Sequence, residues 1–178
     1  PVLLVLGGLQ PGNTKPLTEK AKDSIKEHWG HVFERSAQPF DHAFFERDGF
    51  IYDTEPPSRA IVALHSLAKD VSLAALKAVH RAFYAENRDV TDREVLADIA
   101  EELGQDRDAF LTAFDLDDNR TATQRGFDFS RSINVTGFPT LLAGDNDNGY
   151  RALTQGYQSW EDIQPALDAY LAEPEIQV

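Results

Sequence analysis

The stretch Val135-Thr136-Gly137-Phe138-Pro139-Thr140, continued by the apolar run Leu141-Leu142-Ala143, carries the strongest fold signal in the chain. A proline directly before a buried strand cannot donate a hydrogen bond to the sheet and, in a trans peptide, bends the approach to it. A cis bond costs only about 0.5–1 kcal/mol before proline and would expose the edge of the preceding backbone. We therefore expect Phe138–Pro139 to be cis; an ordinary trans turn is the alternative.

The residues that follow this stretch predict a hairpin and a closing helix. Asp145-Asn146-Asp147-Asn148-Gly149 is typical of a hairpin turn, and Tyr150–Thr154 is the expected return strand. Gly156 ends that strand. Ser159 with Asp162 indicates the start of a last helix, which we expect to stop before Pro174.

The residues before this stretch predict one strand and a block of helices. Val2–Leu6 is a short apolar run that ends at Gly7-Gly8, typical of a strand buried on both faces. Helical spacing then starts at Leu17 with a stripe that includes Trp29 and Phe33, and Phe40–Asp53 is an aromatic, aperiodic connection. Further helix starts are indicated at Pro56-Pro57, at Ser72, at Thr91 with Glu94, at Asp106 and at Asp117, with stops at Gly104 and Asn134.

Composition excludes several classes of function. The chain has 178 residues, 42% of them hydrophobic and 26% charged, which is typical of a globular protein with one sizeable core. Thirty acidic residues against 17 basic ones give a net charge of −13, without the basic cluster that a nucleic-acid backbone requires. No apolar run is long enough to span a membrane. Cysteine is absent, so these residues carry no disulfide, thiolate metal site or cysteine nucleophile.

Few residues outside the proline stretch indicate chemistry. His28 and His31 lie near acidic residues on the first helix, but no second histidine–carboxylate set accompanies them, and we expect no metal site. Neither a nucleophile elbow nor a phosphate-binding glycine loop is present. Glu55, Ser58 and Arg59 open a helix; they are either a cap with a surface ion pair or the wall of a ligand groove.

The chain resembles the DsbA-like thioredoxin-fold proteins. Val135–Thr140 is similar to their cis-proline loop, and Leu141-Leu142-Ala143, the hairpin and Gly156-Tyr157 also match. Asp53–Ala60 and Arg81–Tyr84 match the helical insertion of that group. The resemblance implies an α/β thioredoxin-like fold with a large helical insertion between the second strand and the cis-proline strand. Residues 1–16 and 134–178 would then form the thioredoxin-like subdomain, incomplete at its N-terminus, and residues 17–133 the insertion.

The resemblance also implies an activity and identifies what is missing for it. In this family a low-pKa thiolate of a Cys-x-x-Cys motif attacks disulfides, while the cis-proline loop holds the substrate backbone. This chain supplies no catalytic residue; Thr136, Gly137, Phe138 and Pro139 map onto the substrate-binding loop. The expected function is that of a thiol–disulfide oxidoreductase whose redox motif lies outside this sequence. The alternatives are a cysteine-free adaptor and a relative of the kappa-class glutathione transferases or chromene carboxylate isomerases.

Further expectations concern substrates, location and the N-terminus. The resemblance implies protein or small-thiol substrates, glutathione among them as a substrate and not a cofactor. We expect a cytoplasmic protein, and the composition indicates no nucleic-acid or membrane partner. Since the chain starts at Pro1 and contains no methionine, we expect the natural N-terminus upstream. In a thioredoxin fold a first strand lies between the second strand and the cis-proline strand. We therefore expect Val2–Leu6 and Thr140–Ala143 not to pair directly, and another strand to fill the gap.

Overall fold

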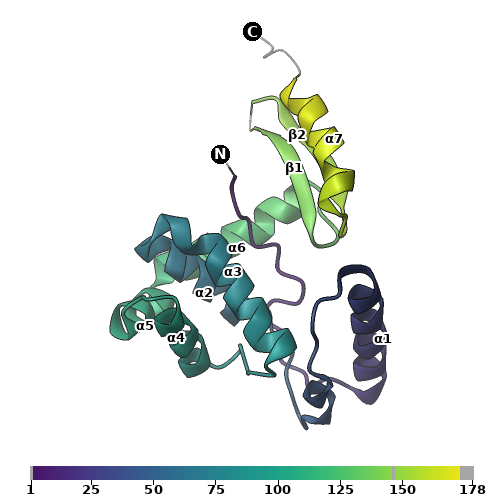
Figure 1. Ribbon diagram of the computed structural model, residues 1–178. Coiled ribbons are helices and arrows are strands. Elements are labelled where there is room, and N and C mark those ends of the chain that lie inside the picture. The colour runs from purple at the N-terminus through teal and green to yellow at the C-terminus, as the bar shows by residue number, and fades with distance from the viewer. Residues whose placement is uncertain (1, 146, 173–178) are drawn as a thin grey trace. The chain divides into compact units, whose positions relative to one another are not determined.

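The computed structural model describes residues 2–145 and 147–172 (Figure 1). Its contacts divide the chain into two units, Pro1–Gly126 and Phe127–Val178, here called the helical unit and the hairpin unit. The elements, in chain order, are α1 (Glu19–Ser36), η1 (His42–Glu46), α2 (Glu55–Leu67), η2 (Lys69–Val71), α3 (Ser72–His80), η3 (Arg81–Ala85), α4 (Arg93–Glu102), α5 (Arg107–Asp115), α6 (Asp117–Ser132), β1 (Thr140–Asp145), β2 (Gly149–Gln155) and α7 (Trp160–Leu171). The assignment of residues 1–16 and 134–178 to one subdomain stays a prediction.

The helical unit is built around buried aromatic rings. Trp29 of α1 is 3% exposed, and its ring centroid lies 4.9 Å from that of Phe40 and 5.3 Å from that of Phe44. Phe44 in turn lies 5.1 Å from Phe83 of η3. Offset and edge-to-face pairs of this kind add to the hydrophobic gain from burying each ring. The aperiodic aromatic segment that the sequence predicts as a packed connection is therefore part of the core.

Short polar side chains start most of the helices at or near the predicted residues. Thr18, Asp106 and Ser159 accept hydrogen bonds from the backbone of the first turns of α1, α5 and α7. The stops at Gly104 and Asn134 are also confirmed, since both residues have left-handed backbone conformations with φ of 77° and 58°.

Two predicted caps are wrong by one residue. Asp92, not Thr91, caps α4, because its Oδ1 accepts from the Glu94 N–H at 2.8 Å, while Thr91 donates its hydroxyl to Asp89. Ser72 is the first residue of α3 instead of its cap. In addition, Phe33 does not belong to a buried stripe on α1, since it is 55% exposed.

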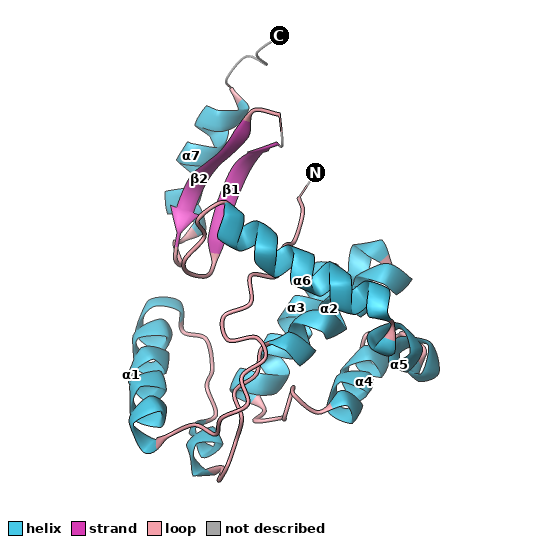
Figure 2. Ribbon diagram, turned by 180° about the vertical axis from the view of Figure 1, so that it is seen from behind, coloured by secondary structure: helices cyan, strands magenta, loops and turns pink. Residues whose placement is uncertain are grey.

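The hairpin unit contains the predicted hairpin and closing helix (Figure 2). β1 and β2 pair antiparallel from Thr140↔Gln155 to Asp145↔Gly149, with an irregularity between Leu141 and Leu142. Pro174 lies outside the described residues.

The predicted strand at Val2–Leu6 is not formed. The sheet of the described residues contains β1 and β2 alone, so no direct pairing of Val2–Leu6 with Thr140–Ala143 is found there. A strand exists only as part of a ladder, because its backbone groups need partners outside the segment. The apolar composition of Val2–Leu6 indicates a buried strand, but the described residues provide no neighbour for it.

Candidate functional site

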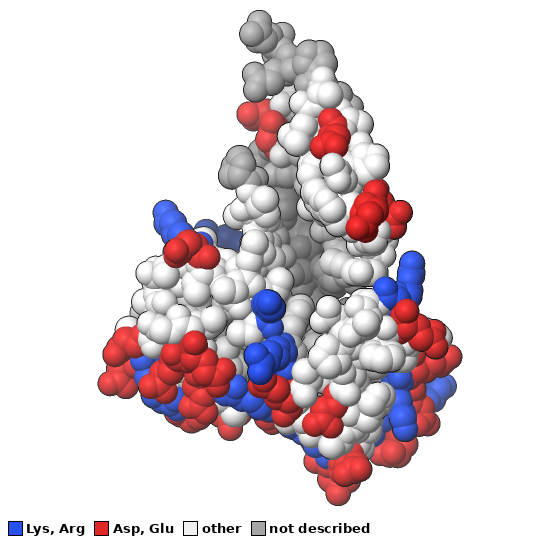
Figure 3. Space-filling model, viewed as in Figure 1, with Lys and Arg blue, Asp and Glu red and all other residues white. Residues whose placement is uncertain are grey.

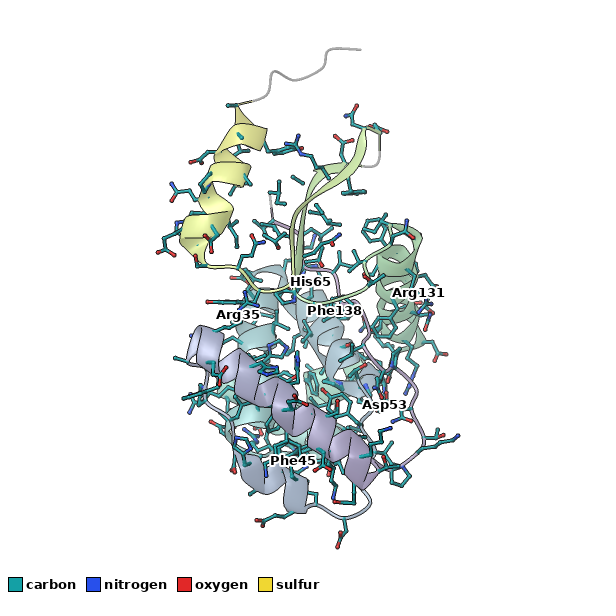
Figure 4. The ribbon with its side chains drawn as sticks, turned by 90° about the vertical axis from the view of Figure 1, so that its right-hand side faces the viewer. Arg35, Phe45, Asp53, His65, Arg131 and Phe138 are labelled. Atoms are coloured by element: carbon teal, nitrogen blue, oxygen red, sulfur yellow. The ribbon has the colours of Figure 1, made fainter. Side chains whose placement is uncertain are left out.

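The loop that joins α6 to β1 contains the predicted substrate-binding residues (Figure 4, where Phe138 is labelled). α6 ends as the Val135 N–H donates to the Ser130 carbonyl at 2.9 Å, after the left-handed Asn134. The Phe138–Pro139 peptide bond is cis, as expected from the sequence. The loop is thus held at both ends by regular structure.

Two carbonyl groups of the loop accept hydrogen bonds, whereas the backbone groups of Phe138 between them do not take part in any within the part of the chain that the structure describes. The Thr140 hydroxyl donates to the Gly137 carbonyl at 2.8 Å, and the Gly156 N–H donates to the Pro139 carbonyl at 2.8 Å. Within the described residues, neither the N–H nor the carbonyl of Phe138 has a hydrogen-bond partner. Phe138 is 45% exposed, and a Cβ built on Gly137 meets no atom within 4 Å. The loop therefore offers an unpaired backbone edge beside an apolar side chain, the arrangement that pairs with an extended peptide.

The second set of candidates, Glu55 and Arg59, forms an internal ion pair. Arg59 donates from Nε to Glu55 at 2.8 Å and from a terminal nitrogen to the Phe114 carbonyl at 2.9 Å. Its guanidinium also lies 3.9 Å from the centre of the Phe114 ring. Arg59 is 6% exposed, so the pair links α2 to α5 inside the helical unit and is not the surface ion pair considered from the sequence.

Ser58, the third member of that set, lines a cavity of the helical unit that contains neither Glu55 nor Arg59. Its hydroxyl donates to the Thr54 carbonyl at 2.7 Å. The sequence analysis missed Tyr52, His80 and Tyr84 in the same cavity lining. The available signal was the phenol group of Tyr52 and Tyr84 beside phenylalanines, since a tyrosine in such a setting brings a polar tip into apolar surroundings.

Charges of both signs intermingle on the helical unit (Figure 3). Arg107 has carboxylates of Glu94, Asp98 and Glu101 as partners, and these hydrogen bonds raise the pKa of its guanidinium. Arg107 in turn lowers the pKa of Glu94. Such half-exposed networks orient side chains but contribute little stability each. Across residues 2–145 and 147–172, no group of three or more histidine and acidic side chains is placed to hold a metal ion.

Comparisons with known proteins agree with this geometry. A family model described as "DSBA-like thioredoxin domain" matches residues 18–168. A solved structure from Nitrosomonas europaea, described as a "putative protein disulfide isomerase", is 30% identical, with a TM-score of 0.86 over 90% of this chain and 78% of that one. The cytosolic disulfide reductase DsbM from Pseudomonas aeruginosa is 23% identical, with a TM-score of 0.74 over 90% of this chain and 80% of that one. Among curated proteins no significant match is found.

The fold and the cis-proline loop define a thioredoxin-like α/β protein with a large helical portion. The chain belongs to the family of DSBA-like thioredoxin domains. The fold class expected from the sequence is thereby confirmed. None of the helices in the described part of the chain combines the length and the apolar character needed to cross a membrane.

Proposed function

We propose that this chain is the scaffold and substrate-binding part of a thiol–disulfide oxidoreductase whose Cys-x-x-Cys motif lies outside the present sequence. The observation that carries the proposal is the exposed loop Thr136–Pro139, with its cis bond and the unpaired backbone of Phe138, in a chain of the DsbA-like family. Family membership supports the reaction class, as does the description of the N. europaea relative as a "putative protein disulfide isomerase".

In this proposal the loop binds substrate and supplies no nucleophile. A thiolate of the redox motif attacks one sulfur of a substrate disulfide, and the other sulfur leaves as a thiolate; the second cysteine of the motif then resolves the mixed disulfide. The Phe138 N–H and carbonyl would pair with the substrate backbone next to that sulfur. Gly137 permits this approach because no side chain stands above the loop.

The substrate class that fits is a protein segment or a small thiol with an apolar body, since the side chain of Phe138 lies beside the polar edge. Glutathione is included as a substrate, because the P. aeruginosa reductase is described in a structure "with GSH". That relative is also described as cytosolic, which supports the cytoplasmic location expected for this protein.

The test compares the 178-residue chain with the product of the full coding sequence in an insulin-reduction assay. We expect turnover only in the longer protein, and only when it carries a Cys-x-x-Cys before the present Pro1. Turnover above background by the cysteine-free chain would contradict the proposed mechanism. A full coding sequence without any cysteine would favour the adaptor alternative.

A loop variant tests the role of Thr136–Pro139 in the same assay. Gly137→Val in the longer protein should lower kcat/KM at least about 10-fold, because a new side chain displaces a hydrogen-bonded substrate strand. Its melting temperature should not change, since a Cβ at Gly137 meets no neighbour. Gly30→Ala in α1 is the matched control, because that position is equally open and lies in the helical unit. Equal activity of both variants would remove the loop from the site.

A further inference from the structure

A cavity of about 120 Å³ lies inside the helical unit, between the segment that precedes α2, α2 itself and the α3–η3 helices. Its apolar walls are buried side chains: Phe50, Ile61, Val79, Phe83 and Val90. An apolar cavity of about 150 Å³ takes up benzene. The cavity of this chain is therefore of the size that holds one six-membered ring.

Most polar groups of the lining already have partners. The Asp53 carboxylate accepts from the N–H groups of Gly12 and Glu55 at 2.8 and 2.9 Å. The Thr54 hydroxyl accepts from the Gln10 N–H at 3.0 Å. The hydroxyls of Ser58 and Thr91 donate within their own segments. These groups shape the cavity and have little capacity left for a ligand.

The phenols of Tyr52 and Tyr84 differ from these polar groups in their hydrogen bonding. They lie near one another in the lining, and burial, followed by the neighbouring Tyr84, raises the pKa of Tyr52. None of the hydrogen bonds found among the described residues involves the hydroxyl of Tyr52 or of Tyr84. Because two phenols carry two O–H donors, and a bond between them uses one, at least one donor remains for a ligand oxygen.

The charges around the cavity favour a neutral ligand. Asp53 in the lining brings a carboxylate that disfavours an anion. The ring of His80 lies 5.7 Å from that of Tyr84, but His80 is solvent-exposed, so its imidazole is not a buried cation of the cavity. An anion would therefore lose its hydration without gaining an opposite charge, and a cation would meet only the Asp53 carboxylate, which two backbone N–H groups already bind.

We propose that this cavity binds a small neutral aromatic molecule with one hydrogen-bond-accepting oxygen, such as an aromatic ketone. The ring packs against Ile61, Val79 and Phe83, and the oxygen accepts from the Tyr52–Tyr84 phenol pair. All the lining residues belong to the helical unit, so the site is independent of the thiol chemistry proposed for the family loop.

The test uses fluorine NMR on the 178-residue chain with two probes. 4-Fluoroacetophenone carries the acceptor oxygen, and 1-fluoro-4-isopropylbenzene has a similar shape without it. We expect saturable binding of both probes, with the ketone bound more tightly. Tyr52→Phe and Tyr84→Phe should together weaken ketone binding about 3- to 10-fold, the range for one net hydrogen bond, and leave the hydrocarbon unchanged.

Two further variants locate the binding. Leu76→Trp, at a half-buried position of the lining, should fill the cavity and abolish binding of both probes at an unchanged melting temperature. Tyr157→Phe, at an exposed phenol of the hairpin unit, should have no effect. Three results would overturn the proposal. Neither probe binds saturably, the double Tyr→Phe variant binds the ketone as tightly as the wild type does, or Tyr157→Phe weakens ketone binding as much as the double variant does.

Discussion

The two tryptophans of the chain lie in opposite surroundings, one in each unit. Trp29 of the helical unit is 3% exposed among aromatic rings, whereas Trp160 of the hairpin unit is 58% exposed. The contrast extends beyond these two residues. Among the described residues, every buried hydrophobic side chain except Phe127 lies in the helical unit. The hairpin unit instead has Phe138, Leu141, Tyr150, Tyr157 and Leu171 exposed.

This difference shows that the helical unit buries a hydrophobic core of its own, whereas the described part of the hairpin unit does not. Helices bond their own backbone and need only each other's apolar faces. A two-stranded hairpin with one helix cannot bury both faces of its sheet, and an isolated hairpin is marginal in water. The described hairpin unit therefore leaves several large apolar side chains exposed to solvent.

The largest difference in stability between the two units is expected when one phenylalanine is removed from each. Phe44 is 1% exposed, so Phe44→Ala should lower the free energy of unfolding by about 3–5 kcal/mol. Phe138→Ala, at 45% exposure, should change it by less than about 0.5 kcal/mol. Urea unfolding followed by Trp29 fluorescence in a Trp160→Phe background measures the helical unit, and Trp160 fluorescence in a Trp29→Phe background measures the hairpin unit.

A more conservative substitution at Phe44 keeps the experiment informative if Phe44→Ala does not fold. Phe44→Leu leaves a smaller cavity and should cost roughly 1–2 kcal/mol. Equal effects at positions 44 and 138 would show that the hairpin unit buries its apolar side chains in solution, and the contrast between the units would not hold.

The sequence predicted the fold best where the signal is local. The pairing of β1 with β2 up to Asp145 and Gly149, the N-caps at Asp106 and Ser159, and the stop at Asn134 depend on residues close in the chain, and each forms as expected; Asn146 of the predicted turn lies outside the described residues. The strand predicted at Val2–Leu6 was wrong because a strand depends on a pairing partner far away in the sequence. The cap at Asp92 was missed because Thr91 and Asp92 are both good caps, and only the backbone decides between them.

The site shows the same limit. The cis-proline loop has its own sequence signature, so Thr136–Pro139 could be recognised. The cavity could not, because Tyr52 and Tyr84 come from segments 32 positions apart and meet only through packing. Similarly, the spacing of Glu55 and Arg59 predicts an ion pair, but not that Phe114 buries it.

The second comparison sets a buried arginine of the helical unit, Arg59, against a partly exposed one, Arg107. Arg59→Ala should lower the free energy of unfolding by about 2–4 kcal/mol, below the upper range for a buried pair because Glu55 is 27% exposed. Arg107→Ala should have a much smaller effect despite three carboxylate partners, since its side chain is 30% exposed and its ion pairs are screened by water. Thermal and urea unfolding at 0.1 and 1 M NaCl distinguish them. If salt abolishes the Arg59 effect, the α2–α5 link is not shielded from solvent.

The smallest expected effect concerns Asp145 at the hairpin turn, which tests whether the hairpin keeps its local order in solution. The backbone N–H of Asn148 donates to its carboxylate at 2.7 Å, and the Asn148 side chain and the Asp147 N–H add further bonds. These bonds lower the pKa of Asp145 below its usual range, because they favour the ionised form. The native pKa lies below the unfolded one, so the stabilisation is fully present above the unfolded value near 3.9 and is lost as pH falls through the native pKa.

A carboxyl-carbon NMR titration of the folded chain should show the low midpoint of Asp145. Asn148→Ala should return it only part of the way, because the backbone donors remain. A wild-type midpoint at the ordinary aspartate value would show that the turn is not held by Asp145, and that the hairpin unit lacks even this local order.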